Sequence, residues 1–301
     1  MKRVILHPEG PEFSRIISGM WRLKNWNMSE AELKQYVHTC IDNGITTFDH
    51  ADIYGCYSCQ DIFGQLLKKD VGLRSKIELV SKCGIMLKCE KNPEQILGYY
   101  DTSKSHIIGS VENSLRSLGT DYLDLLLIHR PDPLMDPNEI AEAFMELEAS
   151  GKVKYFGVSN FTVSQYEMLQ QSCAFPLVTN QIEFSLMHTA PIYNGVLDQA
   201  IKYFSRPMIW SPLAGGNIFS PSDERTGRIY NELITIKEEI KAESIDQVAL
   251  AWILKHPSQP LLVLGSGKIE RILSQSESLE IKLSREQWFR LLKASHGHDV
   301  P

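Results

Sequence analysis

The chain has 301 residues, 43% of them hydrophobic and 23% charged, and a formal net charge of −6 at pH 7. Its length and composition allow one large globular domain or two ordinary ones. The acidic balance and the lack of a Lys/Arg run argue against nucleic acid and against an anionic membrane as partners. No apolar stretch reaches the length of a signal peptide or of a transmembrane helix, so we expect a cytoplasmic protein.

Short apolar segments rich in Val, Ile and Leu alternate with amphipathic segments along the chain. Most of the apolar segments are almost continuously hydrophobic, as is typical of parallel strands that are covered on their outer side. Eight such strands, with helices between them and no flexible linker, predict an α/β protein with a single domain over residues 1–301, closed as a (β/α)8 TIM barrel. We place the strands at residues 16–21, 45–49, 77–82, 122–129, 154–159, 178–183, 207–211 and 261–265.

Capping boxes, in which a Ser or Thr precedes a Glu or Gln by three residues, mark the start of several helices. Each box satisfies backbone N–H groups that the first turn of a helix leaves without partners. We expect such boxes to begin at Ser29, Thr162, Ser244 and Ser284.

An open, doubly wound sheet is the alternative fold. Its usual dinucleotide fingerprint, G-x-G-x-x-G after an early strand, is absent. The nearest match, at residues 265–270, has Glu270 in place of the third glycine and follows the last strand. That turn still predicts phosphate binding, because backbone N–H groups, Lys268 and Arg271 can all reach an anion. A surface loop with two charges is the other interpretation.

The six cysteines stand at positions 40, 56, 59, 83, 89 and 173. Their scattered spacing indicates no disulfide framework. Cys56 and Cys59 form a C-x-x-C pair, but neither a second pair nor histidines at a similar spacing follow, as a zinc site requires. We therefore expect two thiols near the start of a helix.

Polar side chains follow the predicted strands at their carboxyl ends, where (β/α)8 barrels carry their chemistry. Asp49, Lys82 and His129 each end a strand, and Tyr54 lies just beyond the first of these. An ammonium stabilises a phenolate, and a carboxylate keeps the ammonium charged, so we expect the tyrosine pKa to move from ~10 toward ~7, a change of about 4 kcal/mol. The set predicts that Tyr54 protonates a carbonyl oxygen while a hydride arrives from elsewhere.

Other uses of these residues stay open. Singly, each of them fits a structural role: a cap, a surface charge or a core histidine. Asp49, His50, Asp52 and His129 can also supply ligands in a metal hydrolase, although the His-x-His pair usual in barrel hydrolases is missing and Lys82 has no role there. We expect no metal.

The chain resembles the aldo-keto reductases, most closely the YdhF-like bacterial branch, from about residue 14 to residue 295. The motifs that carry the resemblance are FDHADIYG at 48–55, SK at 81–82, DLLLIH at 124–129, GVSNF at 157–161, NQIE at 180–183 and WSPL at 210–213. The resemblance implies a barrel that binds NADPH in extended form without a Rossmann fold. It also implies reduction of small aldehydes and ketones.

The resemblance assigns proton donation to Tyr54, assisted by Asp49 and Lys82, and orientation of the carbonyl to His129. It places Ser159, Asn160 and Gln181 at the nicotinamide carboxamide, with Trp210 stacked on the ring. Gly265 and Gln275 replace the Lys and Asn of many members, so we expect a looser hold on the adenosine end. The other implied cofactor contacts are Gly19, Met20, Trp21 and Asp49, then Ser211, Leu213 and Gly215 along the pyrophosphate, and Gly265, Ser266, Lys268, Arg271 and Gln275 at the adenosine 2′-phosphate.

The substrate is less specified than the chemistry. Trp21 and Trp26 predict an aromatic mouth to the pocket, and residues 83–105 a wall. Arg130, directly after His129, is a candidate for binding an anionic group, with a structural ion pair as the alternative. Residues 215–228 fit either a lid over the cofactor or an ordinary loop. A cofactor-binding regulatory subunit with slow turnover is the alternative function, and the oligomeric state is not predicted.

Overall fold

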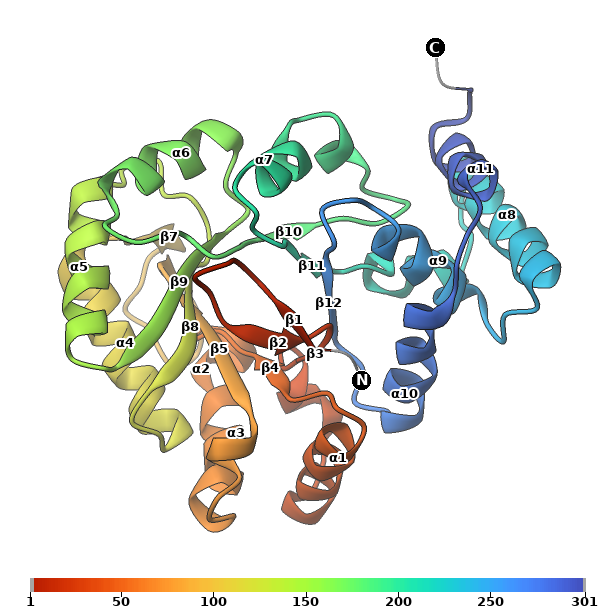
Figure 1. The fold of residues 1–301 in the computed structure, drawn as a ribbon. Coiled ribbons are helices and arrows are strands. Elements are labelled where there is room, and N and C mark those ends of the chain that lie inside the picture. Colours follow the sequence, from red (N-terminus) through yellow and green to blue (C-terminus); the bar gives the residue numbers. More distant parts are fainter. Residues whose placement is uncertain (1–2, 300–301) are drawn as a thin grey trace.

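The computed structural model describes residues 3–299. Its centre is a closed barrel of parallel strands surrounded by helices (Figure 1). The strands neighbour one another in chain order, so the predicted (β/α)8 fold is confirmed, and every strand begins and ends within two residues of its predicted bounds. The barrel strands are β3 (Ile16–Gly19), β4 (Thr47–Asp49), β5 (Glu78–Cys83), β8 (Leu123–Ile128), β9 (Val153–Ser159), β10 (Asn180–Glu183), β11 (Met208–Trp210) and β12 (Leu261–Leu264).

The helices pack on the outside of the strands. On this outer layer Phe144 stacks on Phe156 of β9 with ring centroids 4.3 Å apart, and Trp252 stacks on Trp288 at 5.1 Å. None of the helices within residues 3–299 combines the length and hydrophobicity that crossing a membrane requires. The α-helices are α1 (Glu30–Asp42), α2 (Tyr54–Tyr57), α3 (Cys59–Lys69), α4 (Lys104–Leu118), α5 (Pro137–Ala149), α6 (Val163–Ser172), α7 (Val196–Lys202), α8 (Glu224–Ile240), α9 (Ile245–Leu254), α10 (Ile269–Ser276) and α11 (Arg285–His296). Short 3-10 helices are η1 (Leu23–Trp26), η2 (Arg74–Lys76), η3 (Ala190–Ile192), η4 (Ala214–Phe219) and η5 (Glu277–Glu280).

Three of the four predicted capping boxes are present, at Ser29, Thr162 and Ser284. The prediction at Ser244 is wrong, because no side-chain bond caps α9 there. Gln247 instead accepts a hydrogen bond from the backbone of Glu243 and donates from its amide to the backbone of Ser274. Its side chain is therefore used to join α9 to α10 rather than to complete a box.

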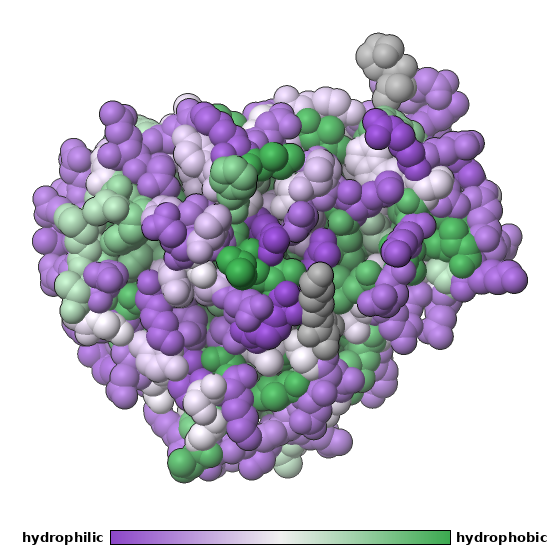
Figure 2. Space-filling model, in the orientation of Figure 1, coloured by the Kyte–Doolittle hydropathy of each residue, from purple (hydrophilic) through white to green (hydrophobic). Residues whose placement is uncertain are grey.

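A hairpin of β1 (Arg3–Ile5) and β2 (Glu12–Ser14), which the sequence did not predict, leads into β3 at the amino end of the barrel. In Figure 1 this hairpin crosses the open end of the barrel, and the surface on the same side is mostly hydrophilic with separate hydrophobic areas (Figure 2). Leu6 and Phe13 of the hairpin pack against apolar side chains of the barrel. The buried cluster that they form with these side chains comprises Leu6, Phe13, Ile17, Val80, Leu125, Leu127, Val178, Met208, Leu261 and Val263.

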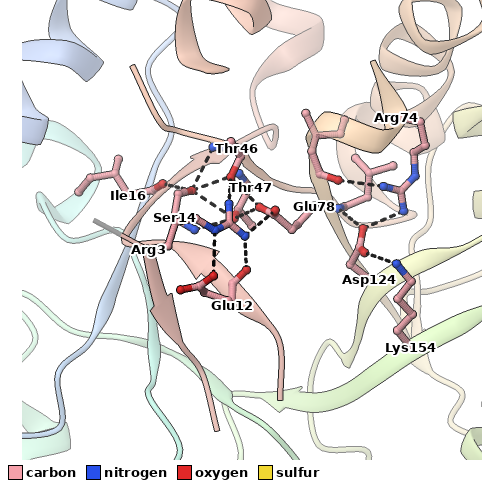
Figure 3. A network of polar contacts seen from close by, with 12 residues as sticks. Arg3, Glu12, Ser14, Ile16, Thr46, Thr47, Arg74, Glu78, Asp124 and Lys154 are labelled. Carbon is pink, nitrogen blue, oxygen red and sulfur yellow. Dashed lines mark hydrogen bonds and ion pairs between the residues drawn. The ribbon is translucent and has the colours of Figure 1, made fainter. Parts of the chain in front are cut away.

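Charged groups tie the hairpin to the strands at this end (Figure 3). Arg3 donates to the Thr46 hydroxyl at 2.7 Å and pairs with Glu78 at 2.8 Å. Beside it, Asp124 accepts from Arg74 at 2.7 Å and pairs with Lys154 at 3.1 Å. This network of hydrogen bonds and ion pairs links β4, β5 and β8 at the end of the barrel opposite to the predicted active site.

A second unpredicted hairpin, of β6 (Ile85–Met86) and β7 (Tyr99–Tyr100), follows β5 at the carboxyl end of the barrel. It folds residue 89 back onto α2, where Cys56 and Cys89 form a disulfide with their Cα atoms 6.0 Å apart. The prediction of unpaired cysteines is therefore wrong for these two, whereas Cys59 is free and buried. Tyr57 strengthens the link, because its hydroxyl accepts from the backbone of Leu87 at 2.9 Å.

Candidate active site

Three of the predicted catalytic side chains meet at the carboxyl end of β4 and β5. The Lys82 ammonium lies 2.7 Å from an Asp49 carboxylate oxygen and 3.0 Å from the Tyr54 hydroxyl. It also donates to the carbonyl oxygen of His50 at 2.8 Å, so its three protons all have acceptors. Lys82 is only 1% exposed and Asp49 only 2%. Asp49 and Lys82 thus form a buried ion pair, and the Lys82 ammonium also contacts the Tyr54 phenol.

The turn after β4 positions the phenol. Gly55 in α2 has a φ of +61°, in the left-handed region that favours glycine. A Cβ atom there would lie 2.7 Å from the sulfur of Cys59 and 2.9 Å from the hydroxyl of Ser58. Another residue at position 55 would strain the backbone and displace these two side chains, and the turn places the Tyr54 ring over Lys82.

The electrostatic expectation for Tyr54 needs correction. Burial raises the pKa of Tyr54, and Lys82 lowers it but not enough to cancel the burial, so that the net shift is upward. Burial alone would lower the pKa of Lys82, but Asp49 and Tyr54 outweigh it and the net shift is also upward. The phenol is therefore a protonated group beside a permanent cation, rather than one whose pKa has moved toward neutrality.

His129 completes the predicted set. Its ring lies edge-on to the Tyr54 ring with the centroids 5.8 Å apart. Burial, together with the charges of Lys82 and Arg130, holds the pKa of His129 well below its usual value. The imidazole is thus neutral at physiological pH and has one N–H group to donate to an oxygen placed beside Tyr54.

A line of hydrogen bonds runs from Asp49 to β11. The second carboxylate oxygen of Asp49 accepts a hydrogen bond from the Gln181 side-chain amide at 2.9 Å. The backbone carbonyl of Gln181 accepts one from the Ser159 hydroxyl at 2.9 Å. Asn160 donates to that hydroxyl at 2.8 Å and accepts from the Trp210 indole at 2.9 Å. The structure therefore brings the four residues predicted for the nicotinamide end together, in contact with the ion pair.

The remaining predicted cofactor residues fall into three places. Gly19 pairs with Asp49 in the barrel, Met20 is buried, and Trp21 is 59% exposed on the following loop. On the other side of the site Ser211, Leu213 and Gly215 follow β11. Gly265, Ser266, Lys268 and Arg271 lie around the start of α10, whereas Gln275 is buried and donates to Asp246 of α9 at 2.9 Å.

Trp26, which the sequence predicts at the mouth of the pocket, packs against the Gly-rich turn before α10. Its ring packs on Tyr36 at 5.2 Å, and a Cβ atom on Gly267 would lie 2.6 Å from the indole. The Tyr36 hydroxyl donates to the carbonyl of Ser266 at 3.0 Å. These residues brace the Gly-rich turn before α10.

His50 and Asp52, two of the residues weighed for a metal site, are buried. His50 packs on Phe63 with ring centroids 4.7 Å apart, and burial lowers its pKa to about 3. Asp52, whose environment is not predictable from the sequence, accepts a hydrogen bond from the Ser110 hydroxyl at 2.7 Å. Residues 3–299 contain no group of three or more His, Cys, Asp or Glu side chains placed to hold a metal ion.

Comparison with known proteins agrees with this geometry. The Aldo/keto reductase family model matches residues 15–295. The chain is 50% identical to the oxidoreductase YdhF of Escherichia coli and 42% identical to a 6-dehydroglucose reductase of Agrobacterium fabrum, in both cases over the full length of both chains. A crystallised thermostable aldo-keto reductase in complex with the inhibitor epalrestat superimposes with a TM-score of 0.81 at 26% identity, covering 98% of this chain and 100% of that one.

Proposed function

Because this chain belongs to the Aldo/keto reductase family, we propose that it reduces aldehydes or ketones to alcohols with NADPH and that Tyr54 is the proton donor. The observation that carries the proposal is the buried ammonium of Lys82, placed between a carboxylate and the phenol. A permanent cation in contact with a protonated phenol has a clear use only if the phenol loses its proton during the reaction.

The residues around the start of α10 and those beside Asp49 support binding of a phosphorylated dinucleotide. Within residues 3–299, Lys268 and Arg271 form no ion pair, and both are exposed at the start of α10. An anionic 2′-phosphate fits this combination of a helix start and two cations. Beside Asp49, the amides of Asn160 and Gln181 and the half-buried ring of Trp210 suit a nicotinamide. When bound, NADPH supplies a hydride from its nicotinamide ring.

Tyr54 acts as the acid in this proposal. Its raised pKa keeps the phenol protonated at neutral pH, as a donor must be. Once the proton has moved to the carbonyl oxygen, the phenolate lies 3.0 Å from the Lys82 ammonium. At an effective dielectric constant of about 20, this contact stabilises the phenolate by roughly 5 kcal/mol. Asp49 keeps the ammonium in place, and the neutral His129 donates a hydrogen bond to the same oxygen.

Replacement of the phenol tests the proposal. Tyr54→Phe keeps the ring and removes the proton, so we expect kcat to fall by about 10²- to 10⁴-fold. NADPH binding, followed by quenching of tryptophan fluorescence, should change by less than about twofold, because the ring of Trp210 is untouched. Tyr57→Phe, which removes a phenol from the same short helix without touching Lys82, is the matched control and should keep its turnover.

Two results would contradict the proposal. Wild-type turnover by Tyr54→Phe would show that another group supplies the proton. Tight NADPH binding by the wild-type protein with slow turnover of every carbonyl compound tested would instead indicate a regulatory, cofactor-binding role.

A further inference from the structure

Arg130 differs from the other arginines of the chain. It is partly buried, yet among residues 3–299 it donates no hydrogen bond and forms no ion pair. The other partly buried arginines have acceptors, as Arg15 has in the carbonyl of Pro260 and Arg74 in Asp124. The structural ion pair considered as an alternative from the sequence is thus absent from the described part of the chain. A guanidinium that gives up some of its water without gaining a protein acceptor needs another explanation.

The position of Arg130 explains why its guanidinium has no acceptor within the protein. It directly follows His129, and its guanidinium carbon lies 5.5 Å from the centroid of the Trp210 ring. That ring is fixed in turn, since its N–H donates to Asn160 at 2.9 Å and the Asn160 amide donates to the carbonyl of His129 at 3.4 Å. A guanidinium that lies over an aromatic ring keeps the N–H groups at its edge free. Arg130 is therefore held at the catalytic end of the barrel with its donors available.

No carboxylate in the described chain forms an ion pair with Arg130, including Glu183, which pairs with Trp210 across β10 and β11. Asp49 is already paired with Lys82 at 2.7 Å. Asp132, two residues further on, is buried and accepts from the Thr102 hydroxyl at 3.1 Å and from the backbone of Leu134 at 2.8 Å. A positive charge with a planar set of donors is thus left beside the residue that would orient the carbonyl.

We propose that Arg130 binds the carboxylate of an anionic carbonyl substrate, so that the preferred substrates are oxo acids rather than neutral aldehydes. This inference rests on the proposed carbonyl reductase function. Arg130 is a specificity residue in this assignment: it forms a charge-assisted, two-pronged hydrogen bond to the carboxylate and takes no part in proton transfer. An ester of the same substrate offers neither the charge nor the paired acceptors.

Two aldehydes that differ only at the carboxyl group test the assignment: 4-carboxybenzaldehyde, which is an anion at neutral pH, and its neutral methyl ester, methyl 4-formylbenzoate. We expect the wild-type protein with NADPH to prefer the carboxylate by at least about tenfold in kcat/KM. In Arg130→Met the ratio should fall to near one, mainly through a higher KM for the carboxylate. Arg130→Lys should restore part of the ratio, because it restores the charge without the planar pair of donors.

The control is Arg285→Met, which removes an exposed arginine lying over Phe289 at 5.6 Å on α11 and should leave the ratio unchanged. Reduction of both aldehydes with no preference in the wild-type protein, or an unchanged preference in Arg130→Met, would overturn the role of Arg130 and leave the proposed function intact. A preference for glyceraldehyde over both compounds that is lost in Arg130→Met would also overturn it, since Arg130 would then bind hydroxyl groups. If neither aldehyde nor glyceraldehyde is reduced, the proposed function and the assignment fail together.

Discussion

Asp52 is a buried carboxyl whose ionisation should set much of the pH dependence of stability. The Ser110 hydroxyl and the backbone N–H of Ile53 donate to its two oxygens, each at 2.7 Å. Burial nevertheless raises the pKa of Asp52 from 3.8 to about 7, against these hydrogen bonds and the nearby charge of Lys82. The folded protein therefore binds a proton between about pH 4 and pH 7 that the unfolded chain has released.

The sign of the effect follows from this difference. A group with a raised pKa in the folded state contributes stability that is complete below its unfolded pKa and is lost as the pH rises through its folded pKa. The difference of about three pH units, at about 1.4 kcal/mol per unit, corresponds to roughly 4 kcal/mol for Asp52. Asp52→Asn carries no charge at any of these pH values and should not lose this stability.

Urea unfolding at pH 4 and at pH 8.5 measures the effect. Relative to the wild-type protein, Asp52→Asn should gain roughly 3–4 kcal/mol in its free energy of unfolding between the two pH values. Asp61→Asn is the control, because Asp61 borders the same small cavity of about 260 Å³ but forms a half-exposed ion pair with Lys91. A relative gain below about 1 kcal/mol for Asp52→Asn would refute the reasoning and place an ionised carboxylate in the folded protein.

Two further substitutions test the ion pair and the disulfide. Lys82→Met leaves the Asp49 carboxylate buried with only the Gln181 amide as a donor, so the free energy of unfolding in urea should fall by about 3–5 kcal/mol. The double variant Lys82→Met with Asp49→Asn should recover part of this free energy but not the turnover. A full loss in the double variant would argue against charge as the cause. Cys56→Ser opens a loop of 33 residues and should lower stability by about 3–4 kcal/mol. Dithiothreitol should lower the free energy of unfolding of the wild-type protein by a similar amount and leave that of Cys56→Ser unchanged. An equal effect on both proteins would assign the loss to another cause.

The barrel was predictable because most of its strands are almost continuously hydrophobic and amphipathic helices follow them. The two hairpins were not, since their strands are only two or three residues long and have no periodicity to detect. Asp49, Lys82 and His129 were predictable as strand ends in a fold that gathers such ends on one face. The distances support their grouping with Tyr54, whose role remains a proposal.

What the sequence could not predict depends on the tertiary environment. The pKa of Tyr54 moves upward because the site excludes more water than a pairwise argument about Lys82 takes into account. Trp26 lies on Gly267 because η1 folds toward α10, which no local pattern specifies. Cys56 and Cys89 meet only because the hairpin of β6 and β7 turns back over α2.

The Cys56–Cys89 disulfide joins the segment that follows Tyr54 to the loop between β6 and β7, and it leaves the strands of the barrel uncrosslinked. We expect reduction of the disulfide to leave the barrel intact and to let one border of the catalytic face open further, which amide hydrogen exchange in residues 84–103 can measure. Kinetic constants measured with and without a thiol in the buffer consequently belong to two covalent species, and values from the two conditions should not be pooled.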